Sequence, residues 1–110
     1  NTNIVHGGSI IYQIECQIHY VMQCLALMLE KSLGALDVRA EANANYNEDV
    51  QARSANLAWG HPNVQSWYKN SDGQVINNSP FSLQEFWEVT HDITPEDFEL
   101  LHAGSNAATD

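Results

Sequence analysis

One long helical stripe constrains the fold of this chain more than any other feature. Apolar residues recur at spacings of three and four through residues 9–33, a pattern that predicts an amphipathic helix of about 25 residues. The stripe consists of Ile10, Ile14, Ile18, Val21, Leu25, Met28 and Leu29. Such a helix is about 37 Å long, whereas a compact chain of 110 residues has a radius of gyration of about 13 Å. The helix length therefore predicts that this segment belongs to a larger fold.

Both ends of the predicted helix carry recognisable signals. Ser9 can accept a hydrogen bond from an amide of the first turn, and Gly34 follows Lys31 where a left-handed residue and a cation are favoured. Within the helix, Cys16 and Cys24 are separated by roughly 12 Å, which is beyond the reach of a disulfide. We expect both to be buried free thiols in a reducing compartment.

Shorter elements follow the helix. Residues 35–41 (ALDVRAE) favour a brief strand, and residues 42–59 resume helical spacing until Gly60 and Pro62. Residues 64–78 alternate apolar and polar side chains on either side of an Asp-Gly pair, which is typical of a hairpin. This part of the chain therefore predicts a strand, a helix and a hairpin in that order.

The last third of the sequence predicts two short helices and a tail. Ser82 and Glu85 form a capping box ahead of the first helix, and Thr94 with Pro95 begins the second, which continues through residues 98–101. Residues 102–110 have no apolar side chains to pack and are expected to form a flexible tail. The expected fold class is mostly α with a small β-hairpin.

Composition excludes some partners. Fourteen acidic residues against four basic ones give a net charge of -10, so nucleic acid and anionic membrane surfaces would repel this chain. There is no run of eighteen apolar residues and no basic-then-apolar leader. We therefore expect no nucleic-acid or membrane partner, and a cytoplasmic location.

Few residues form a catalytic or metal-binding pattern. The triplet His6-Gly7-Gly8 is similar to the oxyanion loop of lipases, but the G-x-S-x-G nucleophile elbow is absent. The five histidines show neither H-E-x-x-H spacing nor a C-x-x-C partner. Carboxylates gather at positions 48–49 and 96–99, where first turns of helices commonly hold them. We assign no catalytic residue and no metal site to this chain.

Three separated stretches together carry a family resemblance. They are NTNIVHGGSIIYQIECQIHYVMQCL at the start, SWYKN followed by GQVINNSP, and FWEVTHDITPEDFELL. In this order they resemble the C-terminal segment of flavin-dependent Baeyer-Villiger monooxygenases of the hydroxyacetophenone-type branch. The resemblance covers the chain from Asn1 to about Leu101.

This resemblance implies that the chain is the incomplete C-terminal part of an α/β flavoprotein with two dinucleotide-binding domains, one for FAD and one for NADPH. Residues 1–101 would complete the FAD-binding domain and carry a loop on the nicotinamide side. The implied reaction inserts oxygen next to a ketone carbonyl to give an ester or lactone. Because the G-x-G-x-x-G fingerprint, the family's signature motif and its active-site arginine are absent, we expect the segment alone to be inactive and to bind neither cofactor.

The resemblance also implies which residues line the sites. Glycines let a flat ring approach the backbone, and the first amides of a long helix carry about half a positive charge. The candidates for cofactor binding are Asn3, Gly7, Gly8 and Ser9 at the flavin and Trp67 at the nicotinamide; Thr2 and Ile4 would border the substrate pocket. The same features are also typical of an ordinary helix cap after a tight turn and, at Trp67, of a core anchor.

Two other functions stay open at this point. One is a related flavin monooxygenase that hydroxylates nitrogen or sulfur, and the other is a free-standing interaction module whose long helix binds a partner groove. The implied partners are the remainder of the same polypeptide, a ketone substrate and oxygen. Alone, the segment is expected to form homodimers or larger species through the uncovered helix.

Overall fold

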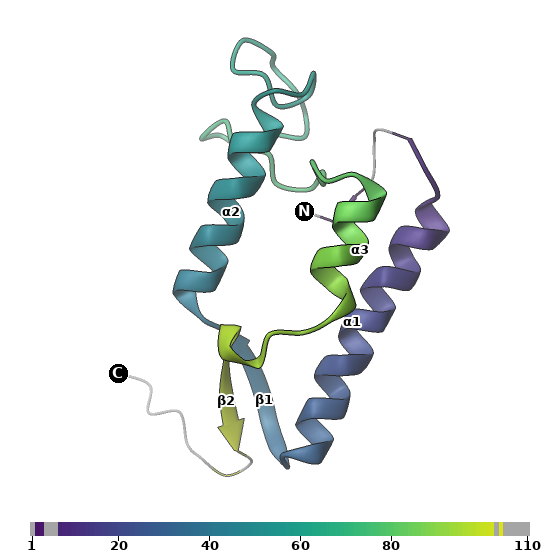
Figure 1. The fold of residues 1–110 in the computed structure, drawn as a ribbon. Coiled ribbons are helices and arrows are strands. Elements are labelled where there is room, and N and C mark those ends of the chain that lie inside the picture. The colour runs from purple at the N-terminus through teal and green to yellow at the C-terminus, as the bar shows by residue number, and fades with distance from the viewer. Residues whose placement is uncertain (1, 4–6, 103, 105–110) are drawn as a thin grey trace.

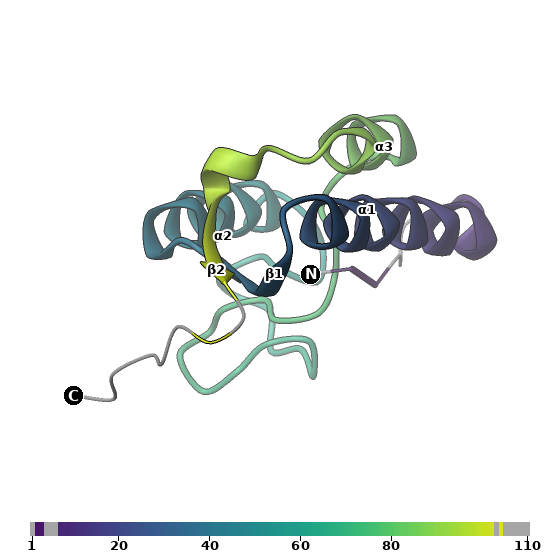
Figure 2. The ribbon, with the colours of Figure 1, turned by 90° about the horizontal axis from the view of Figure 1, so that it is seen from below.

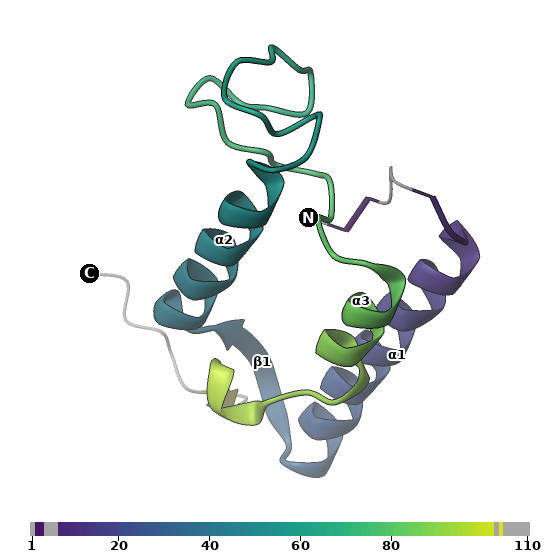
Figure 3. The same cartoon turned by 45° about the horizontal axis from the view of Figure 1, so that its top comes forward.

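Three helices and a two-stranded sheet form the regular structure of the part of the chain described by the computed structural model, residues 2, 3, 7–102 and 104 (Figure 1). The elements are α1 (Ile10–Glu30), β1 (Leu33–Val38), α2 (Ala40–Ser54), α3 (Leu83–His91), a 3-10 turn η1 (Pro95–Asp97) and β2 (Phe98–His102). Helices predominate, as predicted. The chain runs around a ring in which α1 and α2 form opposite sides and the two strands join them at one end (Figure 3).

The long helix begins where the sequence predicts and ends earlier. Ser9 caps α1, and its side-chain oxygen accepts from the Tyr12 amide at 3.2 Å. The helix ends at Glu30, and the residue with positive φ is Ser32 rather than Gly34, which lies within β1. The predicted extension to residue 33 is therefore wrong, because Leu33 already pairs with β2.

The predicted brief strand is present as β1, but it spans residues 33–38 rather than 35–41, since Ala40 and Glu41 already belong to α2. Its partner was not foreseen. β1 pairs antiparallel with β2, and Val38 lies opposite Phe98 while Leu36 lies opposite Leu100. The prediction of a second short helix over residues 94–101 is wrong beyond its first turn. Only η1 is helical there, because the residues after it gain backbone hydrogen bonds from β1 that a short isolated helix could not match.

Helix α2 is also shorter than predicted and ends at Ser54. The chain then turns tightly, and a side chain at Gly60 would collide with the Ser54 carbonyl oxygen. Further along this loop, the Gln51 side chain both accepts from the Val75 amide at 2.9 Å and donates to the Val75 carbonyl at 2.8 Å. This pair of hydrogen bonds fixes residues 55–78, which we call the 55–78 loop, to α2.

The predicted hairpin within the 55–78 loop is reduced to its turn. Gly73 has a φ of +78°, as an Asp-Gly turn requires, and its amide donates to the Asn70 carbonyl at 3.0 Å. A single antiparallel bridge joins Lys69 to Val75, and no regular strand forms between residues 64 and 78. The antiparallel pair of strands in this fold is β1 with β2 instead.

Helix α3 lies along α1 and is held there mainly by polar side chains (Figures 1 and 2). The Gln23 side chain donates to the His91 carbonyl at 2.8 Å and accepts from the Ile93 amide at 3.2 Å. A ring nitrogen of His19 lies 2.9 Å from the same His91 carbonyl, and Trp87 stacks on the His91 ring. Two residues of α1 thus satisfy the end of α3, whose last carbonyls have no partner within the helix.

The small core lies between the helices. It consists of Cys16, Val50, Phe81 and Phe86, with Tyr12 packed against it. Both cysteines are free thiols, as predicted, but Cys24 is only half-buried, and this burial raises the pKa of its thiol. Of the predicted tail, residues 103 and 105–110 lie outside the described part.

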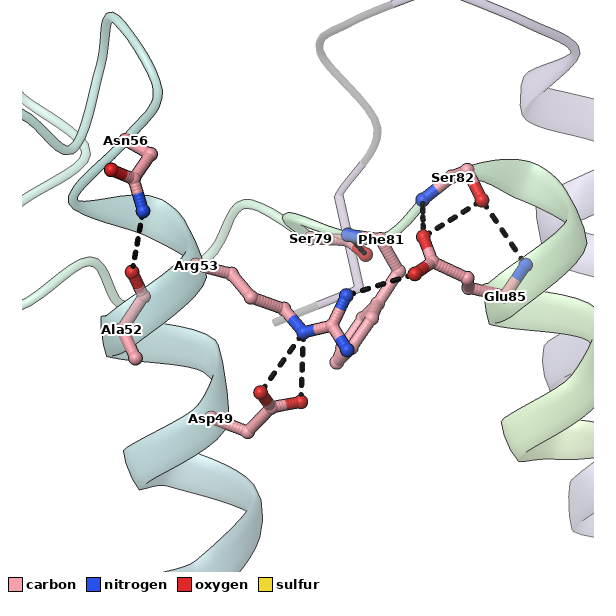
Figure 4. A network of polar contacts seen from close by, with 8 residues as sticks. All are labelled: Asp49, Ala52, Arg53, Asn56, Ser79, Phe81, Ser82 and Glu85. Carbon is pink, nitrogen blue, oxygen red and sulfur yellow. Dashed lines mark hydrogen bonds and ion pairs between the residues drawn. The ribbon is translucent and has the colours of Figure 1, made fainter.

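A polar network joins α2 to α3 beside this core (Figure 4). Arg53 pairs with Asp49 at 2.9 Å and with Glu85 at 2.9 Å, and its guanidinium lies 4.9 Å from the centre of the Phe81 ring. The predicted capping box is confirmed: the Glu85 carboxylate accepts from the Ser82 amide and hydroxyl, and the Glu85 amide donates to the hydroxyl oxygen.

Acid should weaken this network through Glu85. The Ser82 amide, the Ser82 hydroxyl and then Arg53 lower the pKa of Glu85 from 4.5 to about 2. A carboxyl whose pKa is lower in the folded state adds stability that is present above its unfolded pKa and is lost as the pH falls toward the folded value. Glu85→Gln should therefore lower the melting temperature at neutral pH, and the difference from wild type should shrink between pH 4.5 and about 2.

The matched control is Glu88→Gln on the same helix, where the Glu88 carboxylate accepts from Gln84 at 2.9 Å. This variant should melt close to wild type across the same pH range, since its partner is a single exposed side chain. Equal melting temperatures for both variants at neutral pH would show that the capping box contributes no measurable stability.

Candidate functional site

The turn ahead of α1, residues 7–9, is the first part of the predicted site, and we call it the glycine turn. Gly7 and Gly8 have φ angles of +93° and +111°, a conformation that side chains other than hydrogen rarely adopt. A side chain at Gly8 would meet Leu83 of α3 at 2.5 Å, whereas no other described residue places an atom within 4 Å of a side chain at Gly7. The positive φ angles therefore explain why both positions are occupied by glycine. The Gly7 side of the turn is open to a flat group.

Ser9 contributes to this turn through its cap. Its side-chain oxygen accepts from the Tyr12 amide, and its carbonyl accepts from the Gln13 amide at 3.2 Å. The amides at the very start of α1 point out of the helix, as they do in any helix. The turn thus offers N–H donors and an open glycine face side by side, an arrangement that suits the polar edge of a ring.

Asn3 is fixed in place by the 55–78 loop and the segment that follows it. Its amide donates to the Asn77 carbonyl, its carbonyl accepts from the Ser79 amide, each at 2.9 Å, and its side-chain nitrogen donates to Asn78 Oδ1 at 3.1 Å. Asn78 is fully buried. One of the two N–H donors of the Asn3 side chain is therefore engaged, and the residue is tied to residues 77–79.

Thr2 lies at the edge of a cavity. Its carbonyl accepts from Gln13 Nε2 at 2.9 Å, which fixes it against α1. The cavity has a volume of about 530 Å³ and is bounded by α1, α2, α3 and the start of β2. Its lining residues are Thr2, Gln17, Tyr20, Val21, Val38, Ala42, Asn43, Tyr46, Phe86, Val89, Thr90, Asp97 and Phe98. Ile4, the other residue predicted at a substrate pocket, lies outside the described residues.

Two phenols and one carboxylate give this cavity its polar character. Burial, then Cys24 and Asp97, raise the pKa of Tyr20, and burial followed by Asp49 raises the pKa of Tyr46. Both hydroxyls therefore stay protonated near neutral pH and can donate to a neutral acceptor. No Lys or Arg lines the cavity. It suits a neutral, mainly apolar occupant better than an anion.

Trp67 lies in the 55–78 loop, and its side chain is exposed. Its residue is 77% exposed, and its ring lies 4.0 Å from that of Tyr68. Trp67 is therefore not a core anchor within the described part of this chain. Among the described residues, no hydrogen bond or ring contact joins Trp67 to the glycine turn. The structure therefore brings Asn3 close to the end of this loop but does not bring Trp67 against the flavin-side candidates.

The glycine turn fits one edge of a flavin ring but offers no site for the rest of the cofactor. It offers an open face at Gly7 and the N–H groups of a 21-residue helix. A dinucleotide also needs a loop that cradles its phosphates, and no G-x-G-x-x-G fingerprint occurs in the sequence. The residues present could contact the ring of FAD but could not hold the cofactor alone.

Across the described residues, no cluster of three or more His, Cys, Asp or Glu side chains is arranged to hold a metal ion. No helix in that part of the chain combines the length and apolar character needed to cross a bilayer.

Sequence reasoning missed the cavity. Tyr20, Tyr46 and Asp97 come from three separate elements, and each has an ordinary local context in the sequence. Their proximity depends on how α1, α2 and η1 are arranged in space. No local pattern could have signalled it.

Known monooxygenases contain a segment similar to this chain. The sequence is 31% identical over 92% of its length to the uncharacterized monooxygenase y4iD of Sinorhizobium fredii, of which it spans 15%. It is 32% identical over 97% of its length to the FAD-binding monooxygenase ktnD of Aspergillus niger, of which it spans 18%. It is 38% identical over 62% of its length to a Baeyer-Villiger monooxygenase of Pseudomonas aeruginosa, of which it spans 13%.

No family model matches the chain, and no solved structure matches it. The chain spans less than a fifth of the length of each of these three relatives. Nearly the whole chain therefore corresponds in sequence to one segment of two longer monooxygenases, of which one is named as binding FAD. The relative named as a Baeyer-Villiger monooxygenase matches 62% of the chain.

Proposed function

We propose that this chain is the C-terminal segment of an FAD- and NADPH-dependent monooxygenase of Baeyer-Villiger type, in the hydroxyacetophenone-type branch. The complete protein would insert an oxygen atom next to a ketone carbonyl and release an ester or lactone. One observation carries the proposal: the similarity to monooxygenases covers 92% and 97% of this chain in two separate relatives. A shared short motif could not extend over that length.

In this proposal residues 1–101 complete the FAD-binding half of a protein with two dinucleotide-binding domains. The remainder of the polypeptide is the main partner, and it supplies the phosphate-binding loops and the catalytic arginine that this chain lacks. FAD, when bound, supplies the oxygen chemistry. The chain itself contributes contacts, orientation and exclusion of water, in a protein we expect to be cytoplasmic.

The glycine turn is the proposed contact to the flavin. The open side of Gly7 lets the ring approach the backbone, and the N–H groups near Gly8 and Ser9 face its polar edge. These donors would favour the ring as it gains negative charge on reduction by NADPH. Asn3 is also a proposed contact to the flavin, and its side-chain nitrogen donates one hydrogen bond to Asn78.

Trp67 is the proposed contact on the nicotinamide side. Its exposed indole offers a large apolar face and one N–H donor on a loop without regular strands. Closure of such a loop over a bound cofactor excludes water and positions the reacting groups. The ketone would lie on the other side of the glycine turn from the flavin, where Thr2 and Ile4 would border its pocket.

Product identity separates this proposal from its nearest alternative, a flavin monooxygenase that hydroxylates nitrogen or sulfur. The complete protein, encoded by the reading frame that contains this chain, would be given cyclic and aromatic ketones together with amines and thioethers. Esters or lactones as the products support the proposal. Exclusive formation of hydroxylamines or sulfoxides would support the alternative.

The 110-residue chain purified alone should bind neither FAD nor NADPH, because it has no phosphate-binding loop. The measurement is the absorption spectrum after gel filtration with excess cofactor. The complete protein, treated in the same way, should retain a flavin spectrum. A stoichiometric flavin spectrum on the short chain would contradict the assignment of the phosphate-binding loops to the remainder.

Gly7→Ala in the complete protein should weaken flavin binding more than its matched control, Gly73→Ala. Both glycines have positive φ, +93° and +78°, and open space where the methyl group would lie, so both substitutions carry a similar backbone penalty. Only Gly7 is proposed to face the ring. We expect the Kd for FAD to rise about 10-fold or more for Gly7→Ala alone, equal to ~1.4 kcal/mol. Equal effects of both variants on FAD affinity would remove Gly7 from the site.

Trp67→Ala in the complete protein should leave the melting temperature and flavin content near wild type, because the side chain is exposed. It should lower kcat/KM for ketone oxidation by about 10-fold, the loss expected if ~1.4 kcal/mol of closure energy is removed. It should also release more peroxide per NADPH consumed. Trp87→Ala is the control, because Trp87 stacks on His91 at the contact between α1 and α3 and its loss should lower stability instead. Wild-type coupling in a stable, flavin-replete Trp67→Ala protein would exclude the proposed role.

A further inference from the structure

The face that α1 turns toward the rest of this chain is its more polar one. Gln13, Cys16 and Leu27 are the buried residues of α1, and Gln23 makes the hydrogen bonds to the end of α3. The opposite face carries eight large apolar residues that are between 46% and 82% exposed. They are Ile10, Ile11, Ile14, Ile18, Val21, Met22, Leu25 and Leu29. We call them the outer face of α1.

The outer face is continuous and uncharged. At about 100° per residue its eight members fall within an arc of roughly 120°, and they extend for about 30 Å along the helix. The two charged residues of α1, Glu15 and Glu30, lie outside this arc. A surface helix ordinarily buries its apolar stripe, and monomeric proteins rarely expose an apolar patch of this extent.

The outer face continues into the cavity between the helices. Val21 belongs to both, and the cavity wall adds the exposed side chains of Val38, Tyr46 and Val89 around the buried ring of Phe86. The full apolar surface is thus a 30 Å ridge beside a hollow of about 530 Å³. A partner that fits it must be apolar along α1 and must also project into the hollow.

We propose that this surface docks the remainder of the longer polypeptide. This inference rests on the proposed function, because it takes the chain to be a segment of a larger monooxygenase. The relatives leave more than four-fifths of their length outside the matched segment, which is ample to cover the surface. A second copy of this chain is a poorer occupant, since each copy has a net charge of -10 and two copies would repel each other.

Thiol labelling in the complete protein tests the proposal. Ile18→Cys places a thiol at the centre of the outer face, where the residue is 56% exposed in this structure, and Glu88→Cys places one at an exposed position of α3 as the control. A Cys24→Ser background removes the half-buried native thiol. Labelling rates with a maleimide are measured in buffer and in guanidinium chloride, at a concentration where light scattering gives the mass of one polypeptide.

We expect folding to slow labelling of the Ile18→Cys thiol by about 10-fold or more relative to the Glu88→Cys thiol. If the ratio of the native to the denatured labelling rate is the same for both thiols, the proposal is overturned, because the outer face is then open in the complete protein. Protection that appears only at concentrations where dimers form would also overturn it, in favour of a second copy. A reading frame that encodes this chain alone would overturn it as well.

Flavin content of the same samples separates this inference from the proposed function. A protein that protects the Ile18→Cys thiol but binds no FAD supports the docking surface and contradicts the monooxygenase. A protein that retains FAD and labels freely at this position supports the monooxygenase and contradicts the docking surface.

Discussion

The pairing of β1 with β2 is the constraint on which the rest of this structure depends. It joins the segment directly after α1 to the segment after α3, and so closes the ring that α2 and the 55–78 loop complete. Arg39 reinforces the junction, since its amide donates to the Asp97 carbonyl at 2.8 Å and its side chain donates to the Glu96 carbonyl. Val38, Asp97 and Phe98 at this junction form one wall of the cavity, while Arg53 with Glu85 and the core residues Val50 and Phe86 hold α2 opposite α3.

The register of this sheet has a cost that Arg39 offsets. Asp37 lies opposite Glu99, and like charges in a cross-strand pair are destabilising. The Arg39 guanidinium lies 3.8 Å from the Glu99 carboxylate, although both side chains are exposed and the attraction is weak. Backbone hydrogen bonds and the apolar pair of Val38 with Phe98 therefore stabilise the sheet more than its charges do.

The polar contact between α1 and α3 explains why the helix faces as it does. Gln23 and His19 supply hydrogen-bond partners to the end of α3, where a partly buried carbonyl without a partner would be destabilising. Meeting this requirement turns the polar face of α1 inward. The outer face is then free for the partner that we propose. One side of α1 therefore contacts α3, and the other side is the proposed docking surface.

The candidate site depends on the same arrangement. The glycine turn begins α1, and Asn3 ties the preceding segment to residues 77–79, which lead from the 55–78 loop into α3. At its α1 end the turn is fixed by the Ser9 cap, whose side-chain oxygen accepts from the Tyr12 amide. A group bound at the open side of Gly7 would lie next to a capped helix end, and a preorganised contact of this kind reduces the entropy lost on binding.

Local signals in the sequence determined the start of α1 at Ser9, the capping box of Ser82 and Glu85, and the turn at Gly73, because each depends on hydrogen bonds between residues only a few positions apart. The sequence also determined the likeness to monooxygenase segments, which needs no coordinates. Tertiary structure alone decided that residues 98–102 form a strand, that the apolar face of α1 points outward, and that a cavity opens between α2 and α3. Each of these depends on contacts between residues that are far apart in the chain, and such contacts can override local preference because they add hydrogen bonds and buried surface that no single segment can form by itself.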